Sequence, residues 1–343
     1  MTVPDTDPGS ILAFRDRQIA VELVAAALLH LDLFTWLSER GGGTATDICE
    51  HYGFAERPVD VLLTLCRAYQ YLEIDAEGVN RVTTKTSEHL TVGSPWYLGP
   101  YYQPMKGSPF VLDYLEVLKT GKPANWRSDD EGADWHESML DETFAREFTS
   151  LMDCRGLAFG QKLAREIEPI ISNHHRILDV GGGSGVYAQA IVTANSHLTG
   201  VVLEQAPVDQ IARKIISERG LSEKIQVVEG DMFNDHWPVD CDIHLLSNVL
   251  HDWDFPEIKR IIARSAESIP AGGLLVIHQA FLNDDKNGPI EVAEYSTLLM
   301  HMTQGRCYSR AELDPILREA GFQANGSGDT FASRGYLTAM RCS

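Results

Sequence analysis

Apolar residues in the first part of the chain recur at the spacing of a helix face. Across residues 15–36 they fall at positions 19, 23, 26, 27, 31 and 34. This spacing predicts one amphipathic helix over residues 15–36, and the three glycines at 41–43 end the pattern.

The next segments have the order of a winged-helix unit. Residues 44–47 (Thr-Ala-Thr-Asp) have the composition of a helix start, and a further helix is predicted over 57–71. Residues 72–82 contain two short extended pieces around a turn. Helix, turn, helix and hairpin together predict a winged-helix-like unit at about residues 11–90. Residues 110–167 are again mostly helical.

The pattern changes character after about residue 168. Short runs of branched apolar residues, each long enough for one strand, lie at 176–180, 198–204, 225–228, 242–246 and 274–278. Helical stretches separate them, at 186–193, 208–219 and 256–268. Strands that alternate with helices predict a doubly wound α/β domain with a parallel, Rossmann-like sheet. We therefore expect a mainly helical domain at 1–168 and an α/β domain at 169–343.

Composition excludes several classes of protein. Hydrophobic residues make up 44% and charged residues 23% of the chain, as in ordinary globular proteins. The longest apolar runs are too short for a bilayer, and the N-terminus lacks the features of a secretory signal, so we expect a cytoplasmic protein. The net charge of −20 repels polyphosphate, which argues against nucleic acid or an anionic membrane as partner. Six scattered cysteines indicate neither a disulfide framework nor a zinc site.

A glycine-rich turn directly follows the first predicted strand of the α/β domain. It contains Asp179, Gly181, Gly183 and Gly185, and the next predicted helix begins at about residue 186. In open α/β sheets, ligands bind beyond the carboxyl ends of the strands, and glycines let the backbone approach them closely. A helix N-terminus adds a site for an anion. The turn therefore predicts binding of a nucleotide-type ligand.

Two acids around the turn favour S-adenosylmethionine over a dinucleotide. The spacing Gly-x-Gly-x-Gly differs from the Gly-x-Gly-x-x-Gly of dinucleotide sites, and S-adenosylmethionine carries an amino-acid head in place of a pyrophosphate. Asp179 suits the methionine ammonium, and Glu204, 19 residues after Gly185, suits the ribose hydroxyls. Asp231 and Met232, after the third strand, suit one polar contact and one apolar adenine face.

Several motifs, in order along the chain, resemble the small-molecule O-methyltransferases of the caffeic acid and hydroxyindole type, including bacterial natural-product enzymes. They are the glycine-rich turn, Glu-Gln-Ala-Pro-Val at 204–208, Gly-Asp-Met-Phe at 230–233, Leu-Leu-Ser-Asn-Val-Leu-His-Asp-Trp at 245–253 and Pro-Ala-Gly-Gly-Leu-Leu-Val-Ile at 270–277. The winged-helix pattern also fits, so the likeness covers nearly the whole chain. It implies a class I methyltransferase domain that binds S-adenosylmethionine, releases S-adenosylhomocysteine and uses no metal. It also implies a homodimer formed by the N-terminal half, which helps to close the partner's substrate pocket.

The resemblance also implies the catalytic group. His251 would be the general base, with Asp252 as its neighbour near the cofactor. Methyl transfer displaces a leaving group that is already activated, so the protein mainly positions the reactants. A phenol is mostly neutral at pH 7, and an imidazole can take its proton as the methyl arrives.

The residues expected to bind the cofactor are Asp179, Gly181, Gly183, Glu204, Asp231, Met232 and Ser247.

One position departs from the family pattern. Relatives with a strong phenol base usually carry a Glu in a Gly-x-Glu-Arg-Thr-like stretch, where it orients the histidine. The matching stretch here, Gln-Gly-Arg-Cys-Tyr-Ser at 304–309, has Cys307 at that place. Glu291 or Glu294 is then the expected substitute, and we assign this catalytic role to Glu294.

Apolar and aromatic side chains near the active end predict a flat, apolar acceptor. The residues expected to line its site are Phe148, Met152, Phe159, Trp253 and Met300. Residues of these types at helical spacing also serve as plain core.

Two other functions stay open at this point. A carbon or nitrogen methyltransferase, or an enzyme that uses the bound S-adenosylmethionine for other chemistry, would have the same fold. A regulatory protein would use the winged-helix pattern to bind DNA, with the cofactor as a signal. Its recognition helix, 57–71, carries only Arg57 and Arg67 as cations, opposed by Asp60, whereas phosphate contacts need several. We therefore predict an O-methyltransferase for a small aromatic, natural-product-type acceptor, without a nucleic-acid or membrane partner.

Overall fold

The computed structural model describes residues 2–124 and 138–342. The chain divides into two compact units, called unit 1 and unit 2 below. Unit 1 comprises Met1–Gly9, Asp130–Phe281 and Arg310–Ser343, and unit 2 comprises Ser10–Asp129 and Leu282–Ser309. These units do not coincide with the two halves of the chain divided at residue 168. Residues 282–309 belong with the N-terminal segment, and residues 138–168 belong with the sheet.

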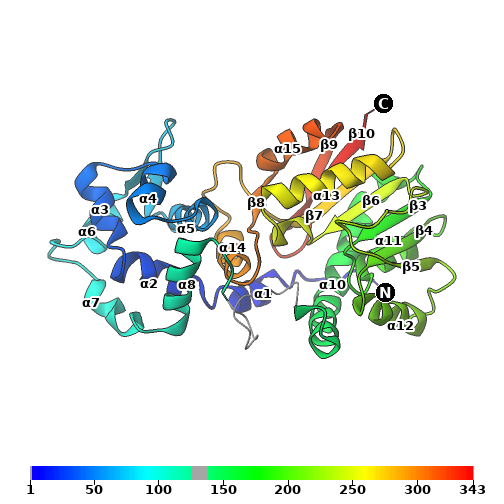
Figure 1. The fold of residues 1–343 in the computed structure, drawn as a ribbon, viewed down its shortest axis with the longest axis horizontal. Coiled ribbons are helices and arrows are strands. Elements are labelled where there is room, and N and C mark those ends of the chain that lie inside the picture. The colour runs from blue at the N-terminus through cyan, green and yellow to red at the C-terminus, as the bar shows by residue number, and fades with distance from the viewer. Residues whose placement is uncertain (1, 125–137, 343) are drawn as a thin grey trace. The chain divides into compact units, whose positions relative to one another are not determined.

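Unit 2 is built mainly from helices (Figure 1). Its elements are α1 (Gly9–Asp16), α2 (Ala20–Leu29), α3 (Leu33–Arg40), α4 (Ala45–Tyr52), α5 (Glu56–Ala68), β1 (Leu72–Ile74), β2 (Asn80–Val82), α6 (Thr84–His89), α7 (Gly99–Tyr102), η1 (Gln103–Met105), α8 (Pro109–Thr120), α14 (Ile290–Met302) and β8 (Tyr308–Ser309). The predicted helix start is confirmed, because Thr44 and Asp47 form a reciprocal capping box at α4. The predicted hairpin is confirmed as well, since β1 pairs antiparallel with β2.

The single helix predicted over residues 15–36 is wrong, because the structure places three helices over residues 9–40. Asp32 separates α2 from α3 with a left-handed φ of 48°, and its Oδ1 accepts a hydrogen bond from Thr35 Oγ1 at 2.5 Å. Short polar side chains such as Asp tolerate this conformation. In addition, α2 is apolar nearly all round and lies in the core, so its periodicity did not mark one face.

Helix α5 has the position in the sequence at which a DNA-recognition helix was considered. It is buried within unit 2. Arg57 and Arg67 are only 8% and 7% exposed. Arg57 donates through Nη1 to Gly305 O at 2.8 Å and through Nη2 to Gly121 O at 2.7 Å. Arg67 donates through Nε to Lys286 O at 3.0 Å. Both cations bind the backbone of the protein itself, which leaves this helix poorly suited to contact phosphates.

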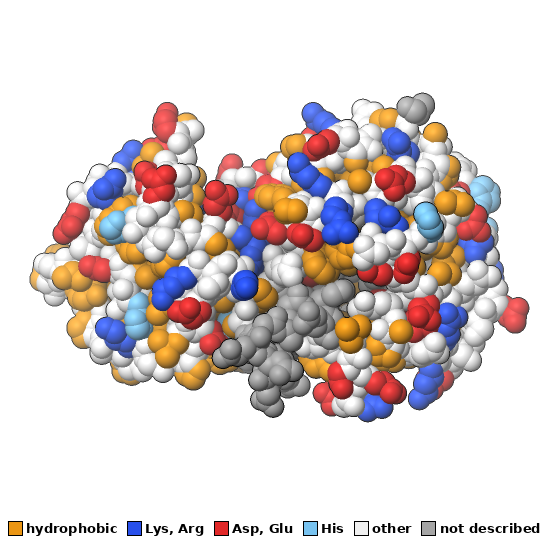
Figure 2. All heavy atoms as spheres, in the orientation of Figure 1, with side chains coloured by type: hydrophobic (Ala, Val, Ile, Leu, Met, Phe, Trp, Pro, Cys, Tyr) orange, Lys and Arg blue, Asp and Glu red, His pale blue; other side chains and the backbone are white. Residues whose placement is uncertain are grey.

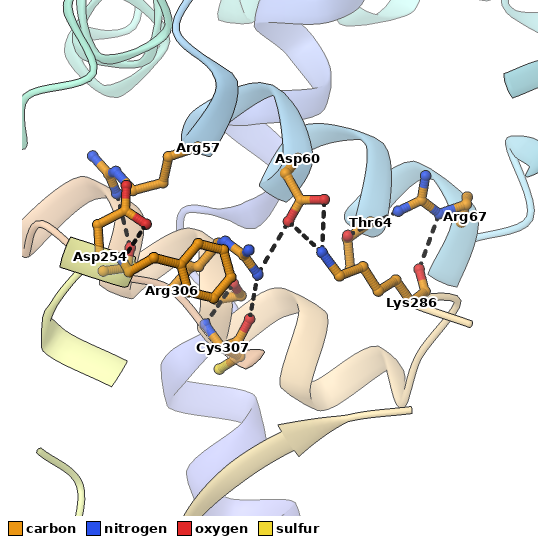
Figure 3. A network of polar contacts seen from close by, with 11 residues as sticks. Arg57, Asp60, Thr64, Arg67, Asp254, Lys286, Arg306 and Cys307 are labelled. Atoms are coloured by element: carbon orange, nitrogen blue, oxygen red, sulfur yellow. Dashed lines mark hydrogen bonds and ion pairs between the residues drawn. The ribbon is translucent and has the colours of Figure 1, made fainter. Parts of the chain in front are cut away.

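A charge network fixes the segment 282–309 against α5 (Figure 3). Asp60 on α5 lies 2.9 Å from Lys286 Nζ and 3.2 Å from Arg306 Nη1. One carboxylate therefore faces two cations of the inserted segment. Charge-assisted bonds of this kind, with little solvent around them, are among the stronger polar contacts in proteins.

Replacing Arg57 by methionine is expected to lower the free energy of unfolding by about 2–4 kcal/mol, because the Gly305 and Gly121 carbonyls lose their donors while buried. Urea unfolding followed by circular dichroism measures the change. Lys119→Met is the control, since its exposed ion pair with Glu116 is worth less than about 1 kcal/mol. Equal stabilities of the two variants would contradict the structural role of Arg57.

No single helix in the two described ranges is long and apolar enough to cross a membrane. The bent pair Gly9–Leu29 and Leu33–Arg40 passes that test by length and composition alone. Most residues of α2 within this pair are buried in the protein.

Unit 1 is a sheet flanked by helices (Figure 1). Its elements are α10 (Glu142–Ile171), β3 (Arg176–Val180), α11 (Val186–Ala194), β4 (Thr199–Glu204), α12 (Val208–Glu218), β5 (Ile225–Glu229), β6 (Ile243–Ser247), η2 (Leu250–Asp252), α13 (Phe255–Ser268), β7 (Leu274–Leu282), α15 (Arg310–Glu319), β9 (Phe322–Asp329) and β10 (Arg334–Arg341). The strand order is β5-β4-β3-β6-β7-β10-β9, and the pairs from β5 to β7 are parallel. The five predicted strands and the helices between them are confirmed within a few residues.

The sheet is not wholly parallel, contrary to the sequence prediction. β10 pairs antiparallel with β7, and β9 pairs antiparallel with β10. β9 was missed because it is rich in Gly and polar residues and mostly exposed, so its sequence shows no apolar alternation. A short antiparallel addition to a parallel sheet is common in doubly wound folds.

Candidate functional site

The candidate site lies in unit 1, where the strand order reverses between β3 and β6. The chain leaves β3 toward β4 and β5 on one side, and leaves β6 toward β7 on the other. The glycine-rich turn follows β3, and residues 248–252 follow β6. A Cβ added at Gly181 would lie 3.4 Å from Val249 Cγ2, so the two segments are in contact. This reversal point is where open α/β sheets bind ligands.

The turn itself requires its glycines. Gly181, Gly183 and Gly185 have φ values of 61°, 58° and 72°, in the left-handed region. A Cβ at Gly185 would lie 2.8 Å from Val202 Cγ2, so this glycine permits tight packing on β4. A Cβ at Gly183 would meet nothing within 4 Å, which leaves its backbone open to a ligand.

Asp179 lies beneath the turn and is fully buried. Its Oδ2 accepts a hydrogen bond from Ala188 N at 3.3 Å, near the start of α11. Its Oδ1 has no hydrogen-bond partner among the described residues. Burial raises the pKa of Asp179 to about 7, and the nearby charge of Glu204 adds to the rise. The carboxyl group therefore supports the turn and keeps one acceptor in reserve.

Glu204 is the last residue of β4 and contacts the glycine-rich turn. Its Oε1 accepts from Gly183 N at 2.8 Å, and its Oε2 accepts from Gln205 N at 3.0 Å. Burial raises the pKa of Glu204 to about 7, against the effect of these two bonds. Each carboxylate oxygen can accept a second hydrogen bond, so Glu204 can also bind hydroxyls of a ligand.

Asp231 and Met232 follow β5, at the same edge of the sheet. The Asp231 carboxylate accepts from Phe233 N at 2.8 Å and from Asn234 Nδ2 at 2.5 Å, so it stabilises its own turn. Met232 Sδ lies 3.7 Å from the position of a Cβ on Gly181. The methionine thus places its apolar side chain against the glycine-rich turn.

His251 lies in the short helix η2 and is 2% exposed. Burial holds the pKa of His251 well below its usual range, and the positive charges of Arg155 and Arg334 lower it further. Its Nε2 lies 3.8 Å from Asp252 Oδ1. Burial also raises the pKa of Asp252 to about 8. At neutral pH the His251 imidazole is therefore neutral, and the Asp252 carboxyl is mainly protonated.

A buried polar chain that the sequence did not reveal extends from this point. Ser247 Oγ lies 3.0 Å from His278 Nδ1, and His278 Nε2 lies 3.0 Å from Thr330 Oγ1. Asn248, with a left-handed φ of 55°, donates through Nδ2 to Tyr187 Oη at 2.9 Å. Ser247, expected at the cofactor, thus also fixes a second histidine. A lone His within an apolar strand gave no sign of this role.

The aromatic and methionine residues expected to line the acceptor site fall into two groups. Phe159 and Met300 are fully buried, in unit 1 and unit 2 respectively, as core residues are. Phe148 and Met152 on α10 are partly exposed, and Trp253, largely buried, packs edge-on against Phe233. Phe148 also packs against a buried cluster of Met139, Ala145 and Val208.

Glu294 lies in unit 2, on α14, where it is 2% exposed. Its Oε1 accepts a short hydrogen bond from Tyr69 Oη, and burial together with this bond raises the pKa of Tyr69. Glu291, the other substitute considered, is exposed at the start of the same helix. Cys307 is fully buried, and its backbone N donates to Ser296 Oγ at 3.0 Å.

Comparison with known families decides the class of this protein. A family model described as an O-methyltransferase domain matches residues 116–323. The chain belongs to this O-methyltransferase family. It is a methyltransferase that depends on S-adenosylmethionine, and the fold expected from the sequence is the fold of this family.

Individual relatives of this O-methyltransferase cover most of its length. It is 31% identical over 297 residues to the 3-hydroxy-5-methyl-1-naphthoate 3-O-methyltransferase of Streptomyces sahachiroi, which covers 86% of this chain and 84% of the relative. It is 27% identical over 310 residues to the L-tyrosine C(3)-methyltransferase of Streptomyces lavendulae, with 86% and 82% covered. The crystal structure of an O-methyltransferase family 2 protein from Planctomyces limnophilus, in complex with apigenin, matches with a TM-score of 0.87, 28% identity and 99% and 100% coverage.

The residues around the turn fit the cofactor of this O-methyltransferase family. The open backbone at Gly183, the reserve acceptor on Asp179 and the free lone pairs of Glu204 suit a ligand that carries an ammonium and hydroxyl donors. Within the two described ranges, no group of three His, Cys, Asp or Glu side chains is arranged to hold a metal ion.

Proposed function

We propose that this O-methyltransferase methylates a hydroxyl group of a small aromatic acceptor, with His251 as the general base. The observation that carries the proposal is the position of His251: it is buried and neutral, and it follows β6 in the segment 248–252, whose Val249 lies against the glycine-rich turn. The relative from S. sahachiroi is named for a hydroxyl of a naphthoate, and the P. limnophilus structure holds apigenin. Both names support a flat aromatic acceptor.

The chain's own groups would hold the cofactor as follows. S-adenosylmethionine supplies a methyl group on a sulfonium sulfur, already activated for displacement. Glu204 accepts hydrogen bonds from the ribose hydroxyls, and Met232 covers an apolar face of the adenine. Asp179 attracts the methionine ammonium from beneath the turn. Asp231 accepts hydrogen bonds from its own turn and has room for a second bond on each oxygen, so it gives one polar contact to the cofactor.

His251 removes the proton of the acceptor hydroxyl. The low pKa of His251 keeps the imidazole neutral at pH 7, so a ring nitrogen is able to take a proton. The same low pKa makes the free imidazole a weak base, and neutral Asp252 gives the imidazolium little support. Proton transfer is therefore expected late, together with formation of the oxygen–carbon bond.

The proposal also covers the acceptor lining, the role of Glu294 and the assembly of the enzyme. Phe148, Met152 and Trp253 line the acceptor site, and Phe159 and Met300, which the sequence also assigns to it, are buried residues of their own units. Glu294 orients His251 in place of the family's usual glutamate. The enzyme works as a cytoplasmic homodimer formed through its N-terminal half. The family resemblance motivates the dimer and the orienting glutamate, and the residue types and apolar runs of the sequence motivate the acceptor lining and the location. Sedimentation equilibrium tests the dimer.

Mass spectrometry of the purified protein tests the proposal. The protein is incubated with a panel of hydroxyaromatic acids and phenols and with S-adenosylmethionine that carries a deuterated methyl group. The expected product carries one labelled methyl on oxygen, and the nuclear magnetic resonance spectrum identifies the atom. No labelled product, although calorimetry detects cofactor binding, would contradict the proposed function.

Methylation on carbon or nitrogen is the second candidate. The 27% identity to a tyrosine C(3)-methyltransferase and the cysteine at position 307 favour it. The same product analysis shows whether the methyl group lies on oxygen, carbon or nitrogen.

A DNA-binding regulator finds less support, since the cations of α5 bind the protein's own backbone. On the face in Figure 2, basic side chains also lie interspersed with acidic ones.

A further inference from the structure

Ser184 is the only residue with a side chain in the glycine-rich turn at 181–185. The glycines around it leave the backbone with few steric restraints, and ordering glycine costs more backbone entropy than ordering any other residue. Other elements can therefore hold this turn only through its backbone or through Ser184. Ser184 is 2% exposed, so its polar groups bond within the protein.

The Ser184 hydroxyl donates to Asp153 on helix α10. The distance from Ser184 Oγ to Asp153 Oδ1 is 2.6 Å. A hydroxyl that donates to a carboxylate forms a charge-assisted bond, which is stronger than a bond between neutral groups. Helix α10 is itself packed tightly on α11, since a Cβ at Gly156 would lie 2.3 Å from Val186 Cγ1. Asp153 thus connects the turn to a closely packed helix.

Arg219, directly after α12, binds the same carboxylate through two nitrogen atoms. Its Nη1 donates to Asp153 Oδ1 at 2.9 Å, and its Nη2 donates to Asp153 Oδ2 at 2.5 Å. The side chains of Arg219 and Asp153 are 22% and 15% exposed, so little solvent surrounds the pair. Two parallel bonds of this kind fix the orientation of the carboxylate that receives the Ser184 hydroxyl.

Gln189 closes a ring of side chains around Ser184. Its Nε2 donates to Ser184 O at 2.7 Å, and its Oε1 accepts from Arg219 Nη1 at 3.2 Å. Gln189 lies on α11 and is 4% exposed. Both the hydroxyl and the carbonyl group of Ser184 are therefore held by residues that Arg219 contacts. The Ser184 ring, as we call it below, consists of Asp153, Ser184, Gln189 and Arg219.

We propose that the Ser184 ring holds the glycine-rich turn in the conformation that receives S-adenosylmethionine, with Asp153 and Arg219 as positioning residues. The neighbouring backbone stays open to the ligand, because a Cβ at Gly183 would meet nothing within 4 Å. A turn that is ordered before the ligand arrives loses less conformational entropy on binding. The inference rests on the assignment of the cofactor to this turn in the proposed function, and it does not depend on the acceptor or on the general base.

Calorimetry with S-adenosylmethionine tests the Ser184 ring in the purified enzyme. Ser184→Ala removes one hydroxyl and leaves the ion pair of Asp153 with Arg219 in place. We expect it to raise the dissociation constant about fivefold, because a charge-assisted bond to the turn is lost. Arg219→Gln should raise the constant at least about threefold, since the carboxylate loses its paired donors. Glu166→Gln, which breaks the pair of Glu166 with Lys162 on the same helix, should leave the constant unchanged.

A double-mutant cycle separates positioning from direct contact with the ligand. If Ser184 acts through Asp153, Ser184→Ala should change the dissociation constant less than about twofold in the Asp153→Ala background. A full fivefold effect in both backgrounds would mean that the hydroxyl itself contacts the ligand, and the positioning role would be wrong. Unchanged affinity in both Ser184→Ala and Arg219→Gln would overturn it as well.

Hydrogen exchange followed by mass spectrometry gives a readout that needs no ligand. In Ser184→Ala and Arg219→Gln, the amides at 181–185 should exchange at least about threefold faster than in the wild type, while those of β6 and β7 keep their rates. A rise of the same size in the strands would indicate general destabilisation and overturn the positioning role. No binding of S-adenosylmethionine by the wild type would contradict the proposed function, whereas faster exchange of the turn in the variants would still show that the ring holds it.

Discussion

Replacing His251 by alanine is expected to lower kcat by about 10²-fold or more while the affinity for S-adenosylmethionine changes only a few-fold. The imidazole acts on the acceptor's proton, whereas the glycine-rich turn and Glu204 hold the cofactor. Radiolabelled methyl transfer gives kcat, and calorimetry gives the cofactor affinity. The two measurements together separate a lost base from a disturbed fold.

His197→Ala is the matched control for this variant, because His197 is an exposed histidine of the same unit. It should leave kcat and affinity unchanged. Unaltered turnover in His251→Ala would mean that the acceptor arrives already ionised, and the role of His251 as base would be wrong. A pH profile of the variant adds a check, since a preionised acceptor would give a rate that follows the acceptor's own pKa.

Replacing Glu204 is expected to weaken cofactor binding by at least about tenfold, because a carboxylate that accepts ribose hydroxyls contributes a charge-assisted bond. Glu204→Ala also removes the acceptor of the Gly183 and Gln205 amides. Glu204→Gln keeps the shape and one acceptor oxygen, so it distinguishes loss of charge from loosening of the turn. Calorimetry with S-adenosylmethionine measures both variants.

The pH dependence of cofactor binding provides a second readout of Glu204. The pKa of this carboxyl is raised to about 7 in the free enzyme, and the ligand's hydroxyl and cationic groups favour the ionised form. Affinity should therefore be full above about pH 7 and fall at lower pH, by up to about tenfold per pH unit for each group that must ionise. In Glu204→Gln this slope should become smaller, with Asp179 still contributing.

Glu229→Gln is the control, since Glu229 pairs with Glu204 across β4 and β5 and is exposed. It should change neither the affinity nor its pH slope. If Glu204→Gln also left both unchanged, the assignment of Glu204 to the ribose would be wrong.

Much of the candidate cofactor site can be predicted from the sequence because its signals are local. The glycine-rich turn needs left-handed backbone at Gly181, Gly183 and Gly185, and this requirement is written into consecutive residues. Glu204 ends a strand with clear apolar character, and His251 follows another. Parallel pairing places the carboxyl ends of such strands along one edge, so their chemistry meets there.

The groups that set the charge around His251 were not predictable in this way. Arg155, Arg334 and His278 come from a helix and two strands far apart in the sequence. A single arginine on a helix looks like a solvated charge, and a single histidine in an apolar strand looks like a core residue. Only the packing of α10 against α11, and the pairing of β10 with β7, bring these three elements into one unit.

By itself, the sequence determined the alternation of strands and helices in the α/β part, the glycine-rich turn and the family motifs, because these follow from backbone periodicity and from the special φ values of glycine. Only the tertiary structure showed that the helical segment is interrupted at Asp32 and that β10 pairs antiparallel with β7. It alone also showed that Arg57 and Arg67 are buried inside unit 2. It alone also decided the protonation states of His251 and Asp252. The physical reason is that the pKa of a side chain depends on its burial and on charges from distant elements. Neither of these shows as a periodic pattern in the sequence.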